Sequence, residues 1–230
     1  MKIQFEEEYN ELDDYFFVNK LMKIIPRTYL IAILIIFHLV GLVGIMLPDF
    51  KELILSLSFL NLILAFLVIL LGEDENKPIL LKFLLIAFVI GVSVELIGVH
   101  TGLLFGDYKY GSNLGPKLWG VPLVIGINWG VLTATSASVT YSIKLPNTLK
   151  IIINAFILVI FDFVMEPVAM NSDFWSWKDN TIPFFNYVCW FFVAVILQLI
   201  YFGMRKPNSN KVFNALFFIQ FIFFIILNFR

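Results

Sequence analysis

Long apolar runs separated by short polar turns dominate this sequence and restrict the folds open to it. A helix that crosses a bilayer needs about 20 consecutive apolar residues. Hydrophobic residues make up 60% of the chain and charged residues only 14%, which excludes an ordinary water-soluble domain. The sequence therefore predicts an all-α, polytopic membrane helical bundle with about seven transmembrane helices. We expect them at residues 28–47, 53–71, 79–101, 118–138, 148–169, 184–204 and 212–229.

The turns between these runs are too short to hold another domain, so we expect residues 28–230 to form a single transmembrane helical domain. Residues 1–27 are rich in charge and predict an amphipathic segment in the cytoplasm or on the membrane surface. No cleavable signal peptide is indicated, because this charged segment precedes the first apolar run.

Lys and Arg predict the orientation, because the cytoplasmic side of a membrane protein carries an excess of them. With a cytoplasmic N-terminus, the inner side holds positions 2, 20, 23, 27, 77, 82, 144, 150, 205, 206 and 211, and the outer side holds 51, 109, 117, 178 and 230. We therefore expect an integral protein of a bacterial-type cytoplasmic membrane, with the N-terminus inside and the C-terminus outside. The net charge of -1 gives no reason to expect a nucleic acid partner.

Three carboxyl groups inside the predicted spans carry the strongest functional signal. An ionisable group at this depth costs about 2.5–3.5 kcal/mol on insertion scales, so it normally faces the protein interior and has a partner or a task. Glu95 lies in the third span, and Asp162 and Glu166 lie in the fifth, all in the same half of the membrane. The last two are four residues apart and share one helix face. We expect the three groups to share one pocket.

Other polar and aromatic residues lie close to the same half of the membrane. Glu95 belongs to a stripe with Gly91, Gly98 and Gly102 that favours close approach of another helix. The predicted residues for binding substrate and water are His100, Asp107, Tyr108, Tyr110, Asn128, Trp129, Trp175, Trp177, Asn186 and Trp190.

Each of these assignments has a purely structural alternative. The acids are also explained by hydrogen bonds between helices, and Trp175 and Trp177 by a belt at the membrane interface. We interpret His38 as a packing residue. We also expect the Ser and Thr residues of the fourth span to bond their own backbone carbonyls.

Several classes of chemistry lack their motifs in this chain. Cys189 is the only cysteine, which rules out an intramolecular disulfide and a cysteine-based metal cluster. The sequence contains no Walker loop, no GxGxxG after a strand and no HExxH. We therefore expect neither a metal site nor a nucleotide cofactor.

Two passages, "ELIGVHTGLLFGDYKYGSNLGPKLWGVPLVIGINW" and "FDFVMEPVAMNSDFWSWKDNTIPFFNYVCW", carry a family resemblance. Their ordered blocks E-x-x-G-x-x-T-G, F-G-x-Y-x-Y, G-V-P, W-x-W and I-P-x-x-N resemble the CruF-type carotenoid 1,2-hydratases, membrane proteins that include bisanhydrobacterioruberin hydratase. The likeness covers residues 95–190. Where the family pattern has Asp before the proline of the second passage, this chain has Glu166, which keeps the carboxyl group but changes its reach.

The resemblance implies a cofactor-independent hydro-lyase. It would add water across the terminal C1=C2 bond of an acyclic (psi) carotenoid end group, as in lycopene or gamma-carotene. This redox-neutral reaction needs an acid that protonates C2 and a second group that deprotonates the attacking water. A close pair of carboxyl groups supplies one acid and one base. Our hypothesis makes Asp162 the proton donor and Glu166 or Glu95 the base.

The remaining roles follow from the same chemistry. Asn186 and His100 would orient water. Trp129, Trp190 and Tyr108 would stabilise the cation through their ring faces. The polar passage that begins at Gly98 would cap the pocket, while the polyene enters from the lipid.

Four other functions remain as alternatives. A carotenoid cyclase would use the same protonation in a dry pocket. A prenyltransferase needs two Asp-rich motifs, and "DFVME" offers at most one. A retinal-binding protein needs a lysine deep in a span, usually the last, and residues 212–229 contain none. A proton-coupled transporter or channel also places acids in the membrane and is the main non-enzymatic alternative.

Overall fold

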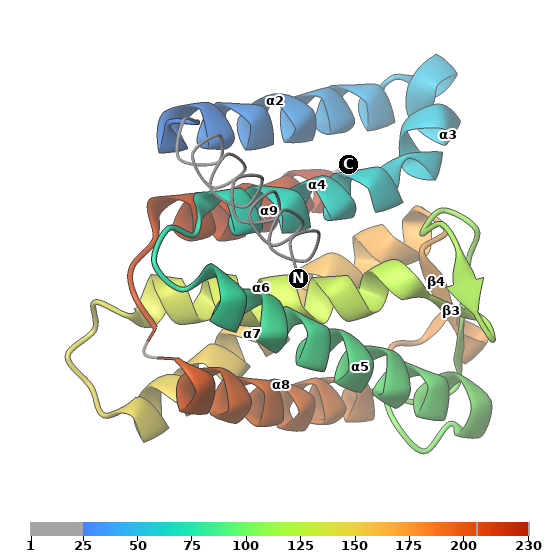
Figure 1. Ribbon diagram of the computed structural model, residues 1–230. Coiled ribbons are helices and arrows are strands. Elements are labelled where there is room, and N and C mark those ends of the chain that lie inside the picture. The colour runs from blue at the N-terminus through green and yellow to red at the C-terminus, as the bar shows by residue number, and fades with distance from the viewer. Residues whose placement is uncertain (1–24, 206, 230) are drawn as a thin grey trace, which may run out of the picture.

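The computed structural model describes residues 25–205 and 207–229. The predicted N-terminal amphipathic segment falls almost entirely on residues 1–24 and lies outside the described part. The helices other than the short α3 run along roughly one common direction, and the short strands gather at one end, which we call the strand end (Figure 1). The helices are α2 Arg27–Met46, α3 Pro48–Ser56, α4 Ser58–Gly72, α5 Lys77–Thr101, α6 Leu123–Thr140, α7 Asn147–Asn171, α8 Phe184–Met204 and α9 Lys211–Asn228. The strands are β1 Tyr108–Tyr110, β2 Lys117–Leu118, β3 Val121–Pro122 and β4 Trp175–Trp177, followed by the 3-10 turn η1 Lys178–Asn180.

Helix α6 lies at the centre of the bundle. Figure 1 shows α2, α4 and α9 on one side of it and α5 and α8 on the other, and α6 contacts α4, α5, α7, α8 and α9. In α6, 83% of the membrane-spanning residues are buried inside the protein, compared with 28–44% in the other candidate spans. Small residues permit this close packing: a Cβ on Gly126 would lie 2.8 Å from the Phe88 carbonyl oxygen of α5. Thr133 and Thr135 bond carbonyls of their own helix, as predicted.

The prediction of about seven transmembrane helices is confirmed. Six helices are long and apolar enough to cross a membrane, and α3 with α4 makes a seventh span if this bent pair is counted as one. The chain bends by 54° between the two helices, at Leu57. The charged residues of α3, Asp49, Lys51 and Glu52, explain why the apolar span begins only with α4.

The fourth span begins later than predicted. Residues 117–122 form a tight hairpin of β2 and β3, and α6 starts at Leu123 rather than at 118. The two turn residues, Trp119 and Gly120, have φ values of 47° and 90°. Positive φ at both central residues is the conformation that suits a two-residue hairpin and cannot continue a helix.

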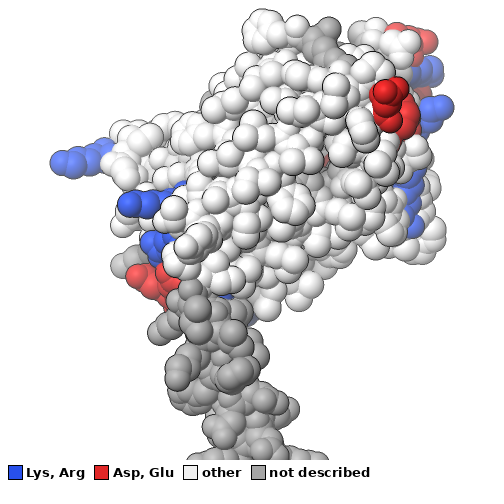
Figure 2. Space-filling model, turned by 90° about the horizontal axis from the view of Figure 1, so that it is seen from above, with Lys and Arg blue, Asp and Glu red and all other residues white. Residues whose placement is uncertain are grey.

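Charged side chains gather at the two opposite ends of the molecule and leave an uncharged surface between them (Figure 2). This distribution, together with the apolar helices, is that of an integral membrane protein. The strand end carries Asp107, Lys109, Lys117 and Lys178, and the opposite end carries Arg27, Asp74, Lys77, Lys144 and Lys150.

A buried ion pair ties the opposite end together. Arg205 Nη2 lies 2.9 Å from Glu73 Oε2, and both side chains are 1% exposed. Removing one partner of a buried pair leaves an uncompensated charge, so we expect Glu73→Ala to lower the free energy of unfolding by about 3–5 kcal/mol. The exposed pair of Arg27 and Asp74 is the control, and Arg27→Ala should cost under about 1 kcal/mol. Denaturant unfolding in detergent micelles measures both, and equal losses would contradict this expectation.

Candidate functional site

A two-stranded ribbon at the strand end places four aromatic side chains beside the predicted acids. Strands β1 and β4 pair antiparallel, with Tyr108 opposite Trp177 and Tyr110 opposite Trp175. Alternate residues of a strand point to the same face, so these four side chains share one face of the ribbon. All four carry an O–H or N–H group, and all four donate it to a carboxyl group of the helices.

Glu95 of α5 accepts the two phenols. Its Oε2 lies 2.5 Å from Tyr108 Oη and 2.7 Å from Tyr110 Oη. Its Oε1 accepts from Trp129 Nε1 of α6 at 3.2 Å. Both carboxyl oxygens therefore have donors, although the side chain is buried at bilayer depth.

Glu166 of α7 accepts the two indoles. Its Oε2 lies 2.9 Å from Trp175 Nε1 and 2.7 Å from Trp177 Nε1. Its Oε1 accepts from Asn186 Nδ2 of α8 at 3.0 Å. The same nitrogen donates to Asp162 Oδ2 at 2.8 Å, so one amide connects the two carboxyl groups of α7.

Asp162 stands one helical turn from Glu166. Its side chain is fully buried, and its Oδ1 has no hydrogen-bond partner in residues 25–205 and 207–229. A buried oxygen without a donor is costly for a carboxylate, whereas a protonated carboxyl group can carry its hydrogen there. This arrangement favours the protonated form of Asp162.

A cavity of about 40 Å³ lies between these groups. A water molecule needs roughly 10–15 Å³, so the cavity has room for water. The ring planes of Trp129 and Trp190 are tilted by only 30°, with centroids 4.1 Å apart, and both residues line the cavity. The predicted site residues in its wall are Glu95, Tyr108, Tyr110, Asn128, Trp129, Glu166, Trp175, Trp177, Asn186 and Trp190.

Three predicted site residues lie outside this cavity. Asp162 is buried behind Asn186. His100 is exposed, with Nε2 3.0 Å from the Trp119 carbonyl oxygen, because α5 ends just after it. Asp107 is exposed and pairs with Lys178 at 3.2 Å. The structure therefore does not bring His100 and Asp107 to the acids.

These contacts decide one alternative that the sequence left open. Trp175 and Trp177 are only 8% and 5% exposed and bind Glu166, so the alternative of a belt at the membrane interface does not describe them. Sequence reasoning did not anticipate which donor serves which carboxyl group. The spacing W-x-W and Y-x-Y was the available signal, because period two is typical of a strand.

Glycines allow the ribbon to reach Glu95. A Cβ on Gly98 would lie 2.7 Å from Tyr108 Oη, and one on Gly91 would lie 2.8 Å from Trp129 Cδ1. The predicted approach of another helix is confirmed at Gly91, which faces α6, whereas Gly98 faces strand β1 and the loop before it. Gly102 has another role: its φ of 65° ends α5, and its N–H bonds the Gly98 carbonyl.

Replacing Gly98 by Ala should displace Tyr108 from Glu95. The expected loss in the free energy of unfolding is about 1.5–3 kcal/mol, the contribution of a hydrogen bond to a charged group. The matched control is Gly203→Ala on α8, where an added Cβ meets no atom within 4 Å. That variant should be as stable as the wild type or slightly more stable. A Gly98→Ala protein with the stability of this control would show that the close approach is dispensable.

The phenols of the ribbon should resist alkali. Burial, and then the neighbouring Glu95 carboxylate, raise the pKa of Tyr108 and Tyr110 above the ordinary value of about 10. A pKa raised by folding contributes stability that is complete below the unfolded pKa and is lost as pH rises above it. We expect the free energy of unfolding to fall above about pH 10, and to fall less steeply in Tyr108→Phe. A pH series of unfolding curves measures this, and identical slopes would contradict it.

Comparisons with known proteins identify the family of this chain. A profile of the family described as carotenoid biosynthesis protein matches residues 52–229, more than half of the chain. The chain belongs to this family. It is also similar to bisanhydrobacterioruberin hydratase of Haloarcula japonica, with 26% identity over 133 residues. The match covers 51% of this chain and 43% of the relative, so the chain spans less than half of that protein's length. No solved structure matches the chain.

Proposed function

We propose that this member of the carotenoid biosynthesis family adds water across the terminal C1=C2 bond of an acyclic (psi) carotenoid end group, as in lycopene or gamma-carotene. The observation that carries the proposal is the small cavity, which has room for water and has Glu95 and Glu166 in its wall. The hydratase relative supports the same reaction class. Because hydration is redox-neutral, the proposed hydro-lyase needs an acid and a base rather than an electron carrier.

Glu166 is the proposed proton donor. It lines the cavity, and the amide of Asn186 donates both to it and to Asp162. Asp162, the donor expected from the sequence, then acts through this shared amide, which positions the Glu166 carboxyl group. Transfer of the proton to C2 forms a C–H bond and leaves a tertiary cation at C1.

Glu95 is the proposed base. Water attacks C1, a C–O bond forms, and the proton released from water goes to Glu95, whose oxygens already act as acceptors for Tyr108, Tyr110 and Trp129. The aromatic rings that line the cavity offer their faces to the cation, an effect worth about 0.5–2 kcal/mol. Cavity water carries the proton from Glu95 back to Glu166, which closes the cycle.

We also propose that the strand end faces away from the cytoplasm in a bacterial-type cytoplasmic membrane. The support is the excess of Lys and Arg assigned to the opposite end in the full sequence. Single cysteines at Lys144 and Lys178, with buried Cys189 replaced by Ala, test this with a membrane-impermeant thiol reagent on intact cells. Labelling only at position 178 is expected, and labelling only at position 144 would reverse the orientation.

The reaction is tested by producing the protein in a bacterial host that makes lycopene. Mass analysis of the extracted pigments should show a product heavier than lycopene by one or two molecules of water. A product of unchanged mass with cyclic ends would instead identify a carotenoid cyclase. Unaltered lycopene, in a host shown to contain the folded protein, would reject both activities for this substrate.

A further inference from the structure

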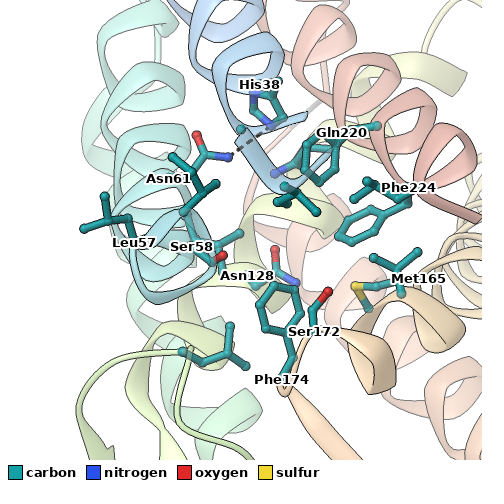
Figure 3. Close-up of a pocket in the computed structure, with 18 of the residues that line it drawn as sticks. His38, Leu57, Ser58, Asn61, Asn128, Met165, Ser172, Phe174, Gln220 and Phe224 are labelled. Carbon is teal, nitrogen blue, oxygen red and sulfur yellow. Dashed lines mark hydrogen bonds between the residues drawn. The ribbon is translucent and has the colours of Figure 1, made fainter. Parts of the chain in front are cut away.

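A second and larger cavity lies on the other side of the central helix. Its volume is about 270 Å³, and it is bounded by α2, the α3–α4 pair, α6, α7 and α9 (Figure 3). Its wall is mostly apolar and includes Phe161, Val168, Phe223, Phe224 and Leu227. We call it the apolar cavity.

The apolar cavity adjoins the small cavity that contains the acids. Ile125, Asn128, Met165 and Trp175 line both spaces. Trp175 also donates to Glu166. The two cavities therefore meet at these side chains, and a chain held in the apolar cavity has its end directed toward the carboxyl groups.

The apolar cavity also reaches the surface that faces lipid. Phe37 and Val40 of α2 line it and are 53% and 56% exposed, and Leu57 and Leu60 of the α3–α4 pair line it and are also exposed. In a membrane bundle such side chains contact acyl chains. Leu57 is the residue at which α3 and α4 bend apart. The opening thus lies between α2 and α4, in the plane of the membrane.

We propose that the apolar cavity binds the isoprenoid segment next to the reacting end of the carotenoid, and that this end enters sideways from the bilayer between α2 and α4. The inference rests on the proposed function and extends it to a binding site. Hydrocarbon suits the apolar wall, because it makes van der Waals contacts there and needs no hydrogen-bond partner. At about 270 Å³ the cavity takes only one end of a carotenoid, so the rest of the chain stays in the lipid.

One part of the wall is polar. His38, Asn61 and Gln220 lie there together, with Asn61 Nδ2 3.4 Å from His38 Nε2 (Figure 3). Asn61 Oδ1 and Gln220 Oε1 are buried and have no hydrogen-bond partner among the described residues. A hydrocarbon cannot donate to them, whereas a water molecule has two hydrogens to give. A water molecule on this wall would satisfy both oxygens while the chain lies along the apolar wall.

Filling the apolar cavity tests the proposal. A Cβ on Gly41 of α2 fits, with Phe223 3.7 Å away, but a phenyl ring there projects into the cavity. We expect Gly41→Phe to weaken binding of lycopene to the purified, detergent-solubilised protein by about tenfold or more, a change of about 1.4 kcal/mol. Gly203→Phe is the matched control, because Gly203 lies on α8 with no atom near its Cβ position. It should bind as the wild type does.

Binding is measured by the induced circular dichroism of the polyene, and unfolding curves establish that both variants are folded. Equal affinities of folded Gly41→Phe and Gly203→Phe would overturn the proposed site. The assay needs no turnover, so tight, Gly41-dependent binding without a hydrated product would reject only the proposed reaction. Should Gly41→Phe fail to fold, Val168→Trp at the end of the cavity near Trp175 replaces it, with the same expected loss.

The class of ligand is tested at the polar wall. Gln220→Leu removes an unpartnered oxygen, so a hydrocarbon chain should bind at least as tightly as it does to the wild type. Weaker binding of lycopene to folded Gln220→Leu would show that this wall recognises the ligand, and would overturn the assignment of a hydrocarbon segment.

Discussion

Replacing Glu166 by Gln is expected to lower the rate of carotenoid hydration by about 10²–10⁴-fold, the contribution of a positioned acid or base. The amide keeps an oxygen that accepts from Trp175 and Trp177, so the ribbon stays in place, but it has no acidic proton for C2. Initial rates with lycopene in proteoliposomes measure the effect. Glu52→Gln, an identical change at an exposed position of α3, should leave the rate unchanged.

The variant Asp162→Asn distinguishes the role of Asp162 from that of the proposed donor, Glu166. Because Asp162 does not line the cavity, we expect a smaller loss than for Glu166→Gln, of about tenfold, and a changed dependence of the rate on pH. A full rate in Glu166→Gln together with an inactive Asp162→Asn would return the donor role to Asp162.

Replacing Glu95 by Gln is expected to cause a loss of similar size, about 10²–10⁴-fold in the rate of hydration, for a different reason. The cation can still form, but no base takes the proton from the attacking water. Protonation at C2 is then reversed by Glu166, so incubation in D2O should exchange hydrogen for deuterium at C2 without adding water. Mass spectrometry of recovered lycopene detects this exchange.

The two variants therefore differ in exchange as well as in rate. Glu95→Gln should exchange and Glu166→Gln should not. The opposite pattern would make Glu95 the acid and Glu166 the base. Exchange by both variants would show that neither residue is the proton donor. Gln at position 95 can still accept from Tyr108 and Tyr110, which limits structural damage.

Much of the bundle was predictable because membrane insertion imposes strong local rules. Apolar length located the spans, and the cost of buried charge indicated that Glu95, Asp162 and Glu166 would face the interior, although Asp162 does not line the cavity of the other two. The spacing of four residues placed Asp162 and Glu166 on one face, and glycine at positions 91 and 98 marked the side on which α5 is approached. These are signals within single helices.

What could not be predicted depends on contacts distant in sequence. The register of β1 with β4 pairs three residues of one loop with three of another. The pairing places the two tyrosines where they donate to Glu95 and the two tryptophans where they donate to Glu166. From the sequence alone, without that register, Trp175 and Trp177 were equally well explained as members of an aromatic belt at the membrane interface. His100 looked close to Glu95 in the sequence, yet α5 ends after Thr101 and leaves it on the surface.

The apolar cavity gave no signal in the sequence. Its polar members, His38, Asn61 and Gln220, come from three helices, and each alone resembles an ordinary packing residue. The bend at Leu57 lies beside the opening of the apolar cavity. In the sequence, the surrounding stretch has the pattern of one continuous apolar helix. Because residues 53–71 were predicted as one span, the bend that we connect with substrate entry was not predicted.

The central claim is that buried carboxyl groups add the elements of water to a carotenoid end. Isotope labelling of the product made by the wild-type protein tests it most directly. In D2¹⁸O, the product should carry one ¹⁸O atom at C1 and one deuterium at C2 for each end that has reacted. Oxygen derived from O2 instead of water, or a product without deuterium at C2, would contradict the account.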